Sequence, residues 1–254
     1  VESFVNKVSE GLRARGYGRA VEFFNGLGGV LGADEVRELP ILLYSSGPAG
    51  GAIGAAALAR RYGIENLLCG DMGGTSFDTT LVHHEKPIVA QRCRIGPFDT
   101  AISLLDIVSI GAGGGSIVGL DARGVPKVGP QSSGSIPGPV CYGLGNDRPT
   151  VTDANVVLGR INADRPIGGK LDRLDVEAAK KAIMVHVGEP LDLDVMQAAE
   201  AVIRVANSKM AGAIRLVSIE RGHNPNEFAG MPFGGGGALH AGALMKDVGL
   251  KNAL

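Results

Sequence analysis

The sequence predicts an α/β protein, because short apolar runs of strand length alternate along the chain with segments of helical periodicity. The longest helical segment covers 194–221, and the strand-like runs are bounded by polar residues and glycine. Glycine-rich turns directly follow several of the predicted strands. The 254 residues can bury a sizeable core and form one large domain or two smaller ones.

The composition excludes several functional classes. The formal net charge of −1 indicates binding neither to nucleic acid nor to an anionic membrane, and no apolar run is long enough to span a bilayer. The 40 glycines follow no fixed period, which excludes collagen. Cys69, Cys93 and Cys141 have no C-x-x-C spacing, which argues against a disulfide framework or a zinc site. Three cysteines without paired spacing, and the lack of a signal peptide pattern, predict that the protein is in the reducing cytoplasm.

The first 62 residues are predicted to begin the alternation of helices and strands. The elements are, in order, a helix ending near Gly16, a strand at 19–25, a short helix at 33–39, a strand at 41–44 and a helix at 48–62. Pro48 suits the first turn of the last helix, where its missing N–H costs no hydrogen bond.

The stretch Cys69–Val82, CGDMGGTSFDTTLV, predicts a β-hairpin whose turn can wrap a phosphate. Gly73 and Gly74 let backbone N–H groups approach an anion closely, and Thr75 adds a hydroxyl donor. Asp71 can hold a hydrated Mg²⁺. The alternative is a tight hairpin in which aspartate and glycine serve the turn geometry only.

A second glycine-rich run, 111–116, follows a predicted strand at 107–110 and resembles part of a dinucleotide-binding fingerprint. Ser116 stands where that fingerprint has its third glycine, and the next segment, 117–120, is a strand rather than a helix. We therefore reject a Rossmann fold and interpret the run as a loop near a binding cleft. Residues 128–149, rich in turn-forming residues, are predicted to be a long loop.

The C-terminal third is predicted to be mainly helical. Helices are expected to start at Thr152 or Asp153 as N-cap and to cover 175–187 and 194–221, followed by a strand at 228–233 and a helix at 238–248. The tetraglycine between the last two elements is a second place where a ligand can lie against backbone. The alternative is a turn that needs glycine only for packing. No Walker A sequence occurs, so a P-loop is not predicted.

Six motifs, in this order, resemble those of the hydantoinase/oxoprolinase family, the ATP-dependent N-methylhydantoinase A type that also includes subunits of acetone and acetophenone carboxylases. They are SGPAGG (46–51), GDMGGTSFD (70–78), IGAGGGSI (110–117), PGPVCYG (137–143), PTVTDANVVLGR (149–160) and FGGGGALHA (233–241). The resemblance covers essentially the whole chain. The sequence differs from the family pattern at Asn146, where a second glycine is expected after Gly145. It implies one α/β, ribonuclease-H-like half of the actin/hexokinase/Hsp70 (ASKHA) fold, a mixed sheet flanked by helices.

The resemblance also implies ATP and Mg²⁺ as cofactors. Asp71 would be the catalytic residue, holding Mg²⁺ through water. The cofactor-binding residues would be Gly73, Gly74, Thr75 and Asp78 in the second phosphate loop and Gly234, Gly235, Gly236 and Gly237 in the adenosine loop. The helices 48–59 and 238–248 would be the two connecting helices. Asp106, Asp153 and His240 are candidate substrate-side or metal-side groups, but a cap or structural role is favoured for each, and none is predicted to be catalytic.

The implied activity is that of an ATP-dependent hydrolase subunit. Phosphorylation of a cyclic amide would let water open the ring, with a partner hydantoinase subunit or domain of the B type. One alternative is a subunit of an ATP-dependent carboxylase acting on a carbonyl compound, acetone or acetophenone. Another, from a different class, is a non-catalytic actin-like domain that senses nucleotide.

The domain organisation is predicted from the same motifs. Residues 1–45 would be the tail end of a preceding subdomain, and 46–254 the second half of the nucleotide-binding domain, with 128–149 as an excursion. Val1 is not a start residue, and the first phosphate loop has no counterpart in the sequence. We therefore expect a partial chain that is inactive when isolated.

Overall fold

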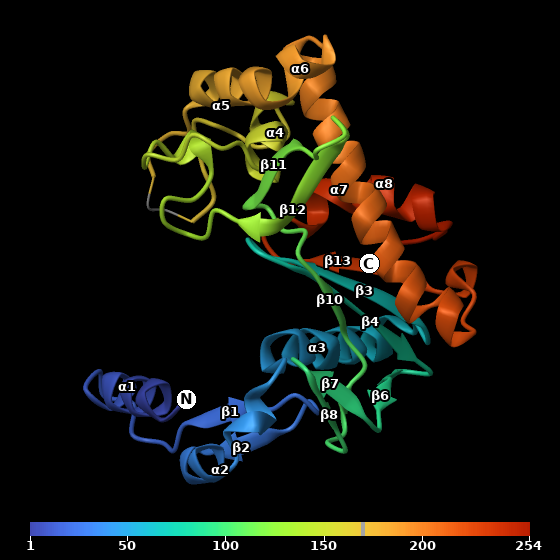
Figure 1. Cartoon of the computed structure of the whole chain (residues 1–254). Helices are drawn as coiled ribbons and strands as arrows, with labels where there is room; N and C mark the ends of the chain where they lie inside the picture. Colours follow the sequence, from blue (N-terminus) through green and yellow to red (C-terminus); the bar gives the residue numbers. More distant parts are fainter. Residues whose placement is uncertain (169–170) are drawn as a thin grey trace. The chain divides into compact units, whose positions relative to one another are not determined.

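The computed structural model describes residues 1–168 and 171–254 (Figure 1). The chain divides into two units, the first made of Val1–Cys69 with Thr80–Ile107, and the second of Gly70–Thr79 with Val108–Leu254. The chain passes between them within strand β3 (Leu67–Met72), within strand β4 (Phe77–His83) and again between Ile107 and Val108. The boundary predicted after residue 45 lies inside the first unit and stays a prediction about domain organisation.

The first unit combines three helices with short strands. Its elements are α1 (Glu2–Arg13), β1 (Glu22–Phe24), β2 (Val30–Gly32), α2 (Ala33–Glu38), α3 (Ser46–Tyr62), β5 (Lys86–Pro87), β6 (Val89–Ala90), β7 (Cys93–Ile95), β8 (Phe98–Thr100) and β9 (Leu104–Leu105). Val5, Phe23 and Val36 form one small core between α1, β1 and α2. The alanines on one face of α3 are buried, and the helix ends at Gly63, whose left-handed conformation caps it.

The strand predicted at 41–44 is wrong. Residues Pro40–Leu43 form a 3₁₀-helix, with the proline at its first turn. Proline fixes φ near the helical value and lacks an N–H, so it favours a helical start over a sheet. A short apolar run such as ILLY carries no periodicity that separates the two structures.

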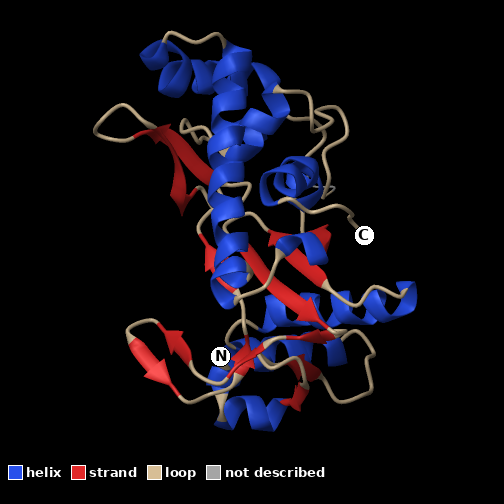
Figure 2. Cartoon of the chain, turned by 90° about the vertical axis from the view of Figure 1, so that its right-hand side faces the viewer, coloured by secondary structure: helices blue, strands red, loops and turns tan. Residues whose placement is uncertain are grey.

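The second unit contains β10 (Val108–Ile110), β13 (Ala229–Phe233) and the parts of β3 and β4 next to the turn that joins them, in a sheet with the strand order β10, β4, β3 and β13. β10 runs antiparallel to β4, with Ile110 opposite Phe77. The long helix α7 (Val195–Val217) contacts β10, and α8 (Gly237–Val248) contacts both β13 and α7 (Figures 1 and 2). A capping box between Asp194 and Gln197 starts α7.

The second unit also contains the hairpin β11 (Ser116–Leu120)–β12 (Pro126–Ser132), which α7 and α4 (Val151–Val157) contact, and several further short elements. They are the helices α5 (Val176–Ile183) and α6 (Glu189–Leu191), a π-helical stretch at Met184–Gly188, and 3₁₀ turns at Val140–Tyr142, Ile219–Arg221 and Pro225–Glu227. The loop predicted from residue 128 is therefore wrong up to residue 132. Pro130 is tolerated there because a two-stranded hairpin leaves one side of each strand unpaired. Within the described part of the chain, no helix is both long and apolar enough to cross a membrane.

The start of α4 also differs from the prediction. Thr150, rather than Thr152 or Asp153, is the N-cap. The buried Asp153 carboxylate accepts hydrogen bonds from the N–H groups of Thr150 at 2.8 Å, Cys141 at 2.8 Å and Val140 at 3.1 Å. Asp153 thus ties the 3₁₀ turn to the helix, which is a structural role.

Candidate functional site

The turn between β3 and β4, residues 73–76, rests on the glycine-rich loop 111–115. A Cβ added at Gly113 would stand 2.6 Å from the carbonyl carbon of Gly74 and 2.6 Å from the amide nitrogen of Thr75. Backbone therefore packs directly on backbone, which requires a residue without a side chain. The loop is a platform that carries the turn.

Hydrogen bonds to this platform fix the direction of two amides in the turn. The N–H of Gly114 donates to the carbonyl oxygen of Gly73 at 3.0 Å, and the N–H of Gly115 donates to that of Gly74 at 2.6 Å. In a trans peptide the C=O and the N–H point in opposite directions. The N–H groups of Gly74 and Thr75 therefore both point away from the platform. Neither has an acceptor among residues 1–168 and 171–254, and both residues are exposed.

Two carboxylates lie on one face of the hairpin beside this turn. Gly70 and Phe77 contact each other on the opposite face, so the alternation of side chains places Asp71 and Asp78 together. Burial, and to a lesser degree the charge of Asp78, raise the pKa of Asp71. The Ser76 hydroxyl donates to Asp78 at 2.9 Å. Such a carboxylate pair fits Mg²⁺, which keeps several waters and binds through one or two carboxylates and substrate phosphates.

The second glycine turn, 234–237, lies against the same strand. The N–H of Gly236 donates to the carbonyl oxygen of Met72 at 3.0 Å. Gly234 has a φ of +80°, and a Cβ added there would stand 2.3 Å from Asp71 Oδ1. The structure thus brings together Asp71 and two turns that are far apart in the sequence.

The first turn of α8, which follows this glycine turn, is anchored by the buried His240. Its Nδ1–H donates to Asn207 Oδ1 at 2.6 Å, and the Asn155 amide lies 3.4 Å from its Nε2. Burial, with a smaller contribution from Arg160, lowers the pKa of His240 to about 4. The neutral imidazole therefore links α8 to α7 and α4.

The sequence model of the hydantoinase/oxoprolinase family matches residues 1–254. The chain belongs to the hydantoinase/oxoprolinase family. It is 38% identical over 256 residues to caprolactamase subunit alpha of Pseudomonas jessenii, and 39% identical over 240 residues to the acetophenone carboxylase gamma subunit of Aromatoleum aromaticum. These alignments cover 99% and 93% of this chain but 36% and 32% of the relatives. The chain thus spans about a third of their length.

The solved structures agree with this membership. A nucleotide-free structure of acetone carboxylase, reported for the mechanism of ATP-dependent acetone carboxylation, superposes with a TM-score of 0.91 at 30% identity. The structural alignment covers 99% of this chain and 35% of the acetone carboxylase chain. The predicted family and fold class, an α/β ASKHA-type fold with a mixed sheet flanked by helices, are confirmed.

The sequence analysis did not identify all the residues that form the candidate site of this hydantoinase/oxoprolinase chain. The run 111–115 was interpreted only as a loop near a cleft, although it supports the turn directly. Ser132, at the end of β12, was not considered, yet its Oγ lies 3.4 Å from Thr75 Oγ1. The sequence signal for both was the density of glycine and serine, which does not specify a contact.

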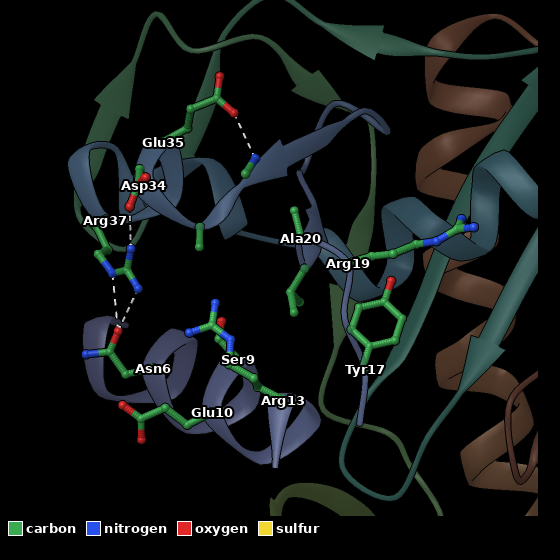
Figure 3. A pocket seen from close by; sticks show the side chains of 13 residues that line it. Asn6, Ser9, Glu10, Arg13, Tyr17, Arg19, Ala20, Asp34, Glu35 and Arg37 are labelled. Carbon is green, nitrogen blue, oxygen red and sulfur yellow. Dashed lines mark hydrogen bonds and ion pairs between the residues drawn. The ribbon is translucent and has the colours of Figure 1, made fainter. Parts of the chain in front are cut away.

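A cavity of about 520 Å³ lies in the first unit, between α1, α2 and the segment 17–21 (Figure 3). Arg37 contacts both Asn6 and Asp34, and the Arg13 side chain points from α1 toward α2. None of the predicted site residues is among those that line this cavity. We therefore place the candidate site at the two glycine turns of the second unit.

Proposed function

We propose that this chain is the nucleotide-binding part of an ATP-dependent hydrolase subunit of the hydantoinase/5-oxoprolinase type, which activates a cyclic amide by phosphorylation for ring opening. The observation that carries the proposal is the pair of N–H groups on Gly74 and Thr75, which point to one side and lack protein acceptors in the described residues. Successive N–H groups of this kind form an anion-binding concavity. Phosphate oxygens are the anion that the neighbouring carboxylates and glycines suit.

Each part of the site then has a role. Asp71, with Asp78 beside it, would hold Mg²⁺ through its waters, and the Gly74 and Thr75 amides would hold the β- and γ-phosphates. The Gly73 N–H, which the sequence also assigned to phosphate, instead donates to the carbonyl oxygen of Ser76 at 3.0 Å. Residues 235–237 would lie against the adenosine, with Gly235 on the open side, where an added Cβ would meet no atom within 4 Å. When bound, Mg²⁺ neutralises charge on the transferred phosphoryl group. The protein's contribution to phosphoryl transfer is positioning and charge stabilisation.

The substrate class is proposed from the relatives. Similarity to a caprolactamase subunit favours a cyclic amide, and similarity to an acetophenone carboxylase subunit supports the alternative, a carboxylase acting on acetone or acetophenone. A partner subunit or domain of the B type would complete the reaction, since both relatives are named as subunits. A non-catalytic nucleotide-sensing domain would bind ATP at the same turn without turnover in the assembled protein.

Calorimetry with Asp71→Asn tests the magnesium role. We expect Mg-ATP to bind the unmutated chain saturably and the variant about tenfold more weakly, a change of about 1.4 kcal/mol. Without Mg²⁺, the variant should bind ATP at least as well as the unmutated chain, because a negative charge near the phosphates is removed. Phosphate release by the 254 residues alone should equal the buffer blank, since one turn leaves the triphosphate facing water.

Glu200→Gln, which removes an exposed charge on α7, is the matched control and should change neither affinity. Equal weakening of Asp71→Asn with and without Mg²⁺ would contradict the assigned role. Phosphate release well above the blank and lost in Asp71→Ala would show that the isolated chain is catalytically sufficient.

A further inference from the structure

A hydroxyl pair links the glycine turn to the end of β12. Thr75 Oγ1 and Ser132 Oγ lie 3.4 Å apart. The next residue, Ser133, donates from its N–H to the carbonyl oxygen of Gly115 at 2.9 Å, and from its hydroxyl to the same oxygen at 3.2 Å. The platform loop that carries the turn therefore also holds Ser132 in place.

A third contact bears on whether the Ser132 hydroxyl donates to Thr75 or accepts from it. The N–H of Gly134 donates to Ser132 Oγ at 3.1 Å. A hydroxyl has one O–H and two lone pairs, so Ser132 already accepts and still has its O–H to donate. Among the residues that the structure describes, the oxygen of Thr75 is the side-chain atom in contact with that O–H.

A phosphate bound beside the turn would determine which of the two hydroxyls, Thr75 or Ser132, donates the hydrogen bond between them. Phosphate oxygens only accept, and the Thr75 hydroxyl belongs to the same residue as one of the two free N–H groups. Each hydroxyl then finds an acceptor when Ser132 donates to Thr75 and Thr75 donates to the phosphate. The present 3.4 Å is long for two hydroxyls, whose usual separation is about 2.7–2.8 Å. A charged acceptor polarises the Thr75 hydroxyl, which strengthens the bond that it accepts.

We propose that Ser132 is a positioning residue for the nucleotide: its hydroxyl donates to Thr75 Oγ1 and so aims the Thr75 hydroxyl at the phosphate held by the Gly74 and Thr75 amides. The inference rests on the proposed function, since it requires nucleotide at this turn. It adds a residue from a separate hairpin to the phosphate site and gives that residue an indirect role.

A double-mutant cycle tests the proposal. The Kd for Mg-ATP is measured by calorimetry for Ser132→Ala, Thr75→Val and the double variant. We expect each single change to weaken binding about three- to tenfold, the range for one lost hydrogen bond. The double variant should bind no more weakly than Thr75→Val, because Ser132 acts only through Thr75. Ser132→Thr, which keeps the hydroxyl, should restore the affinity.

Ser135→Ala, at an exposed neighbouring serine, is the control and should bind as the unmutated chain does. Without nucleotide, the free energies of unfolding of Ser132→Ala and Ser135→Ala should differ by about 1 kcal/mol at most, the value of the one exposed hydrogen bond from the Gly134 N–H that Ser132→Ala loses. Multiplicative losses in the double variant, or normal binding by Ser132→Ala, would overturn the role of Ser132 while leaving nucleotide binding intact. Absence of binding by the unmutated chain would overturn the proposed function and this inference together.

Discussion

Replacing Gly234 with alanine should lower the free energy of unfolding by about 3 kcal/mol and abolish Mg-ATP binding. The new Cβ would stand 2.3 Å from Asp71 Oδ1 and 2.6 Å from the carbonyl oxygen of Met72. The carboxylate can rotate away, but the carbonyl belongs to strand β3 and cannot, so the turn must move. The φ of +80° adds strain for any residue with a side chain.

The neighbouring Gly235 offers a matched control. A Cβ added there has no atom within 4 Å, and its φ lies outside the left-handed region. Gly235→Ala should therefore unfold in urea within about 0.5 kcal/mol of the unmutated chain. Equal unfolding midpoints for the two alanine variants would contradict the close approach of the glycine turn to β3.

His240 should make the protein less stable in acid. Burial lowers the pKa of His240 from 6.5 to about 4. As the pH falls below 6.5, the unfolded chain takes up a proton at this residue, whereas the folded chain does so only near pH 4. Proton uptake by the unfolded state favours unfolding, so stability present above pH 6.5 is lost toward pH 4. At about 1.4 kcal/mol per pKa unit, we expect a loss of about 3 kcal/mol.

His240→Gln isolates this contribution. A glutamine amide can still donate to Asn207 and accept from Asn155, but it does not titrate. The free energy of urea unfolding is measured at pH 7 and pH 4 for the unmutated chain and for His240→Gln. Carboxylates titrate in both proteins, so their contributions cancel when the two pH-dependent changes are subtracted. The unmutated chain should lose about 3 kcal/mol more than His240→Gln between these pH values. Parallel losses would show that His240 is not buried and neutral.

The local features of the site could be predicted from the sequence. The hairpin around Gly73 and Gly74 follows from an apolar run, an aspartate and a double glycine, which specify a strand and a turn within a few residues. The strand, tetraglycine and helix of 228–248 are equally local. The contacts between distant segments could not be predicted, because they depend on which strands pair. The turn 234–237 contacts Met72 because β13 lies beside β3, and no short sequence pattern encodes that pairing.

Two failures have the same physical origin. The platform role of Gly113 requires β10 to pair with β4 in one register, so that the loop after Ile110 reaches the turn before Phe77. The cap of α4 lies in a segment, TVTD, with three side chains able to cap. Which one does so depends on where Asp153 finds its partners in the 3₁₀ turn.

Amide NMR of the ¹⁵N-labelled chain, titrated with Mg-ATP, would show whether nucleotide is held by the turn 73–76. We expect the Gly74 and Thr75 amide protons to move downfield as they donate to phosphate, with amides of residues 234–237 shifting along the same saturation curve. Saturable binding that leaves Gly74 and Thr75 unshifted, or shifts confined to the cavity between α1 and α2, would contradict the assignment of the nucleotide to this site.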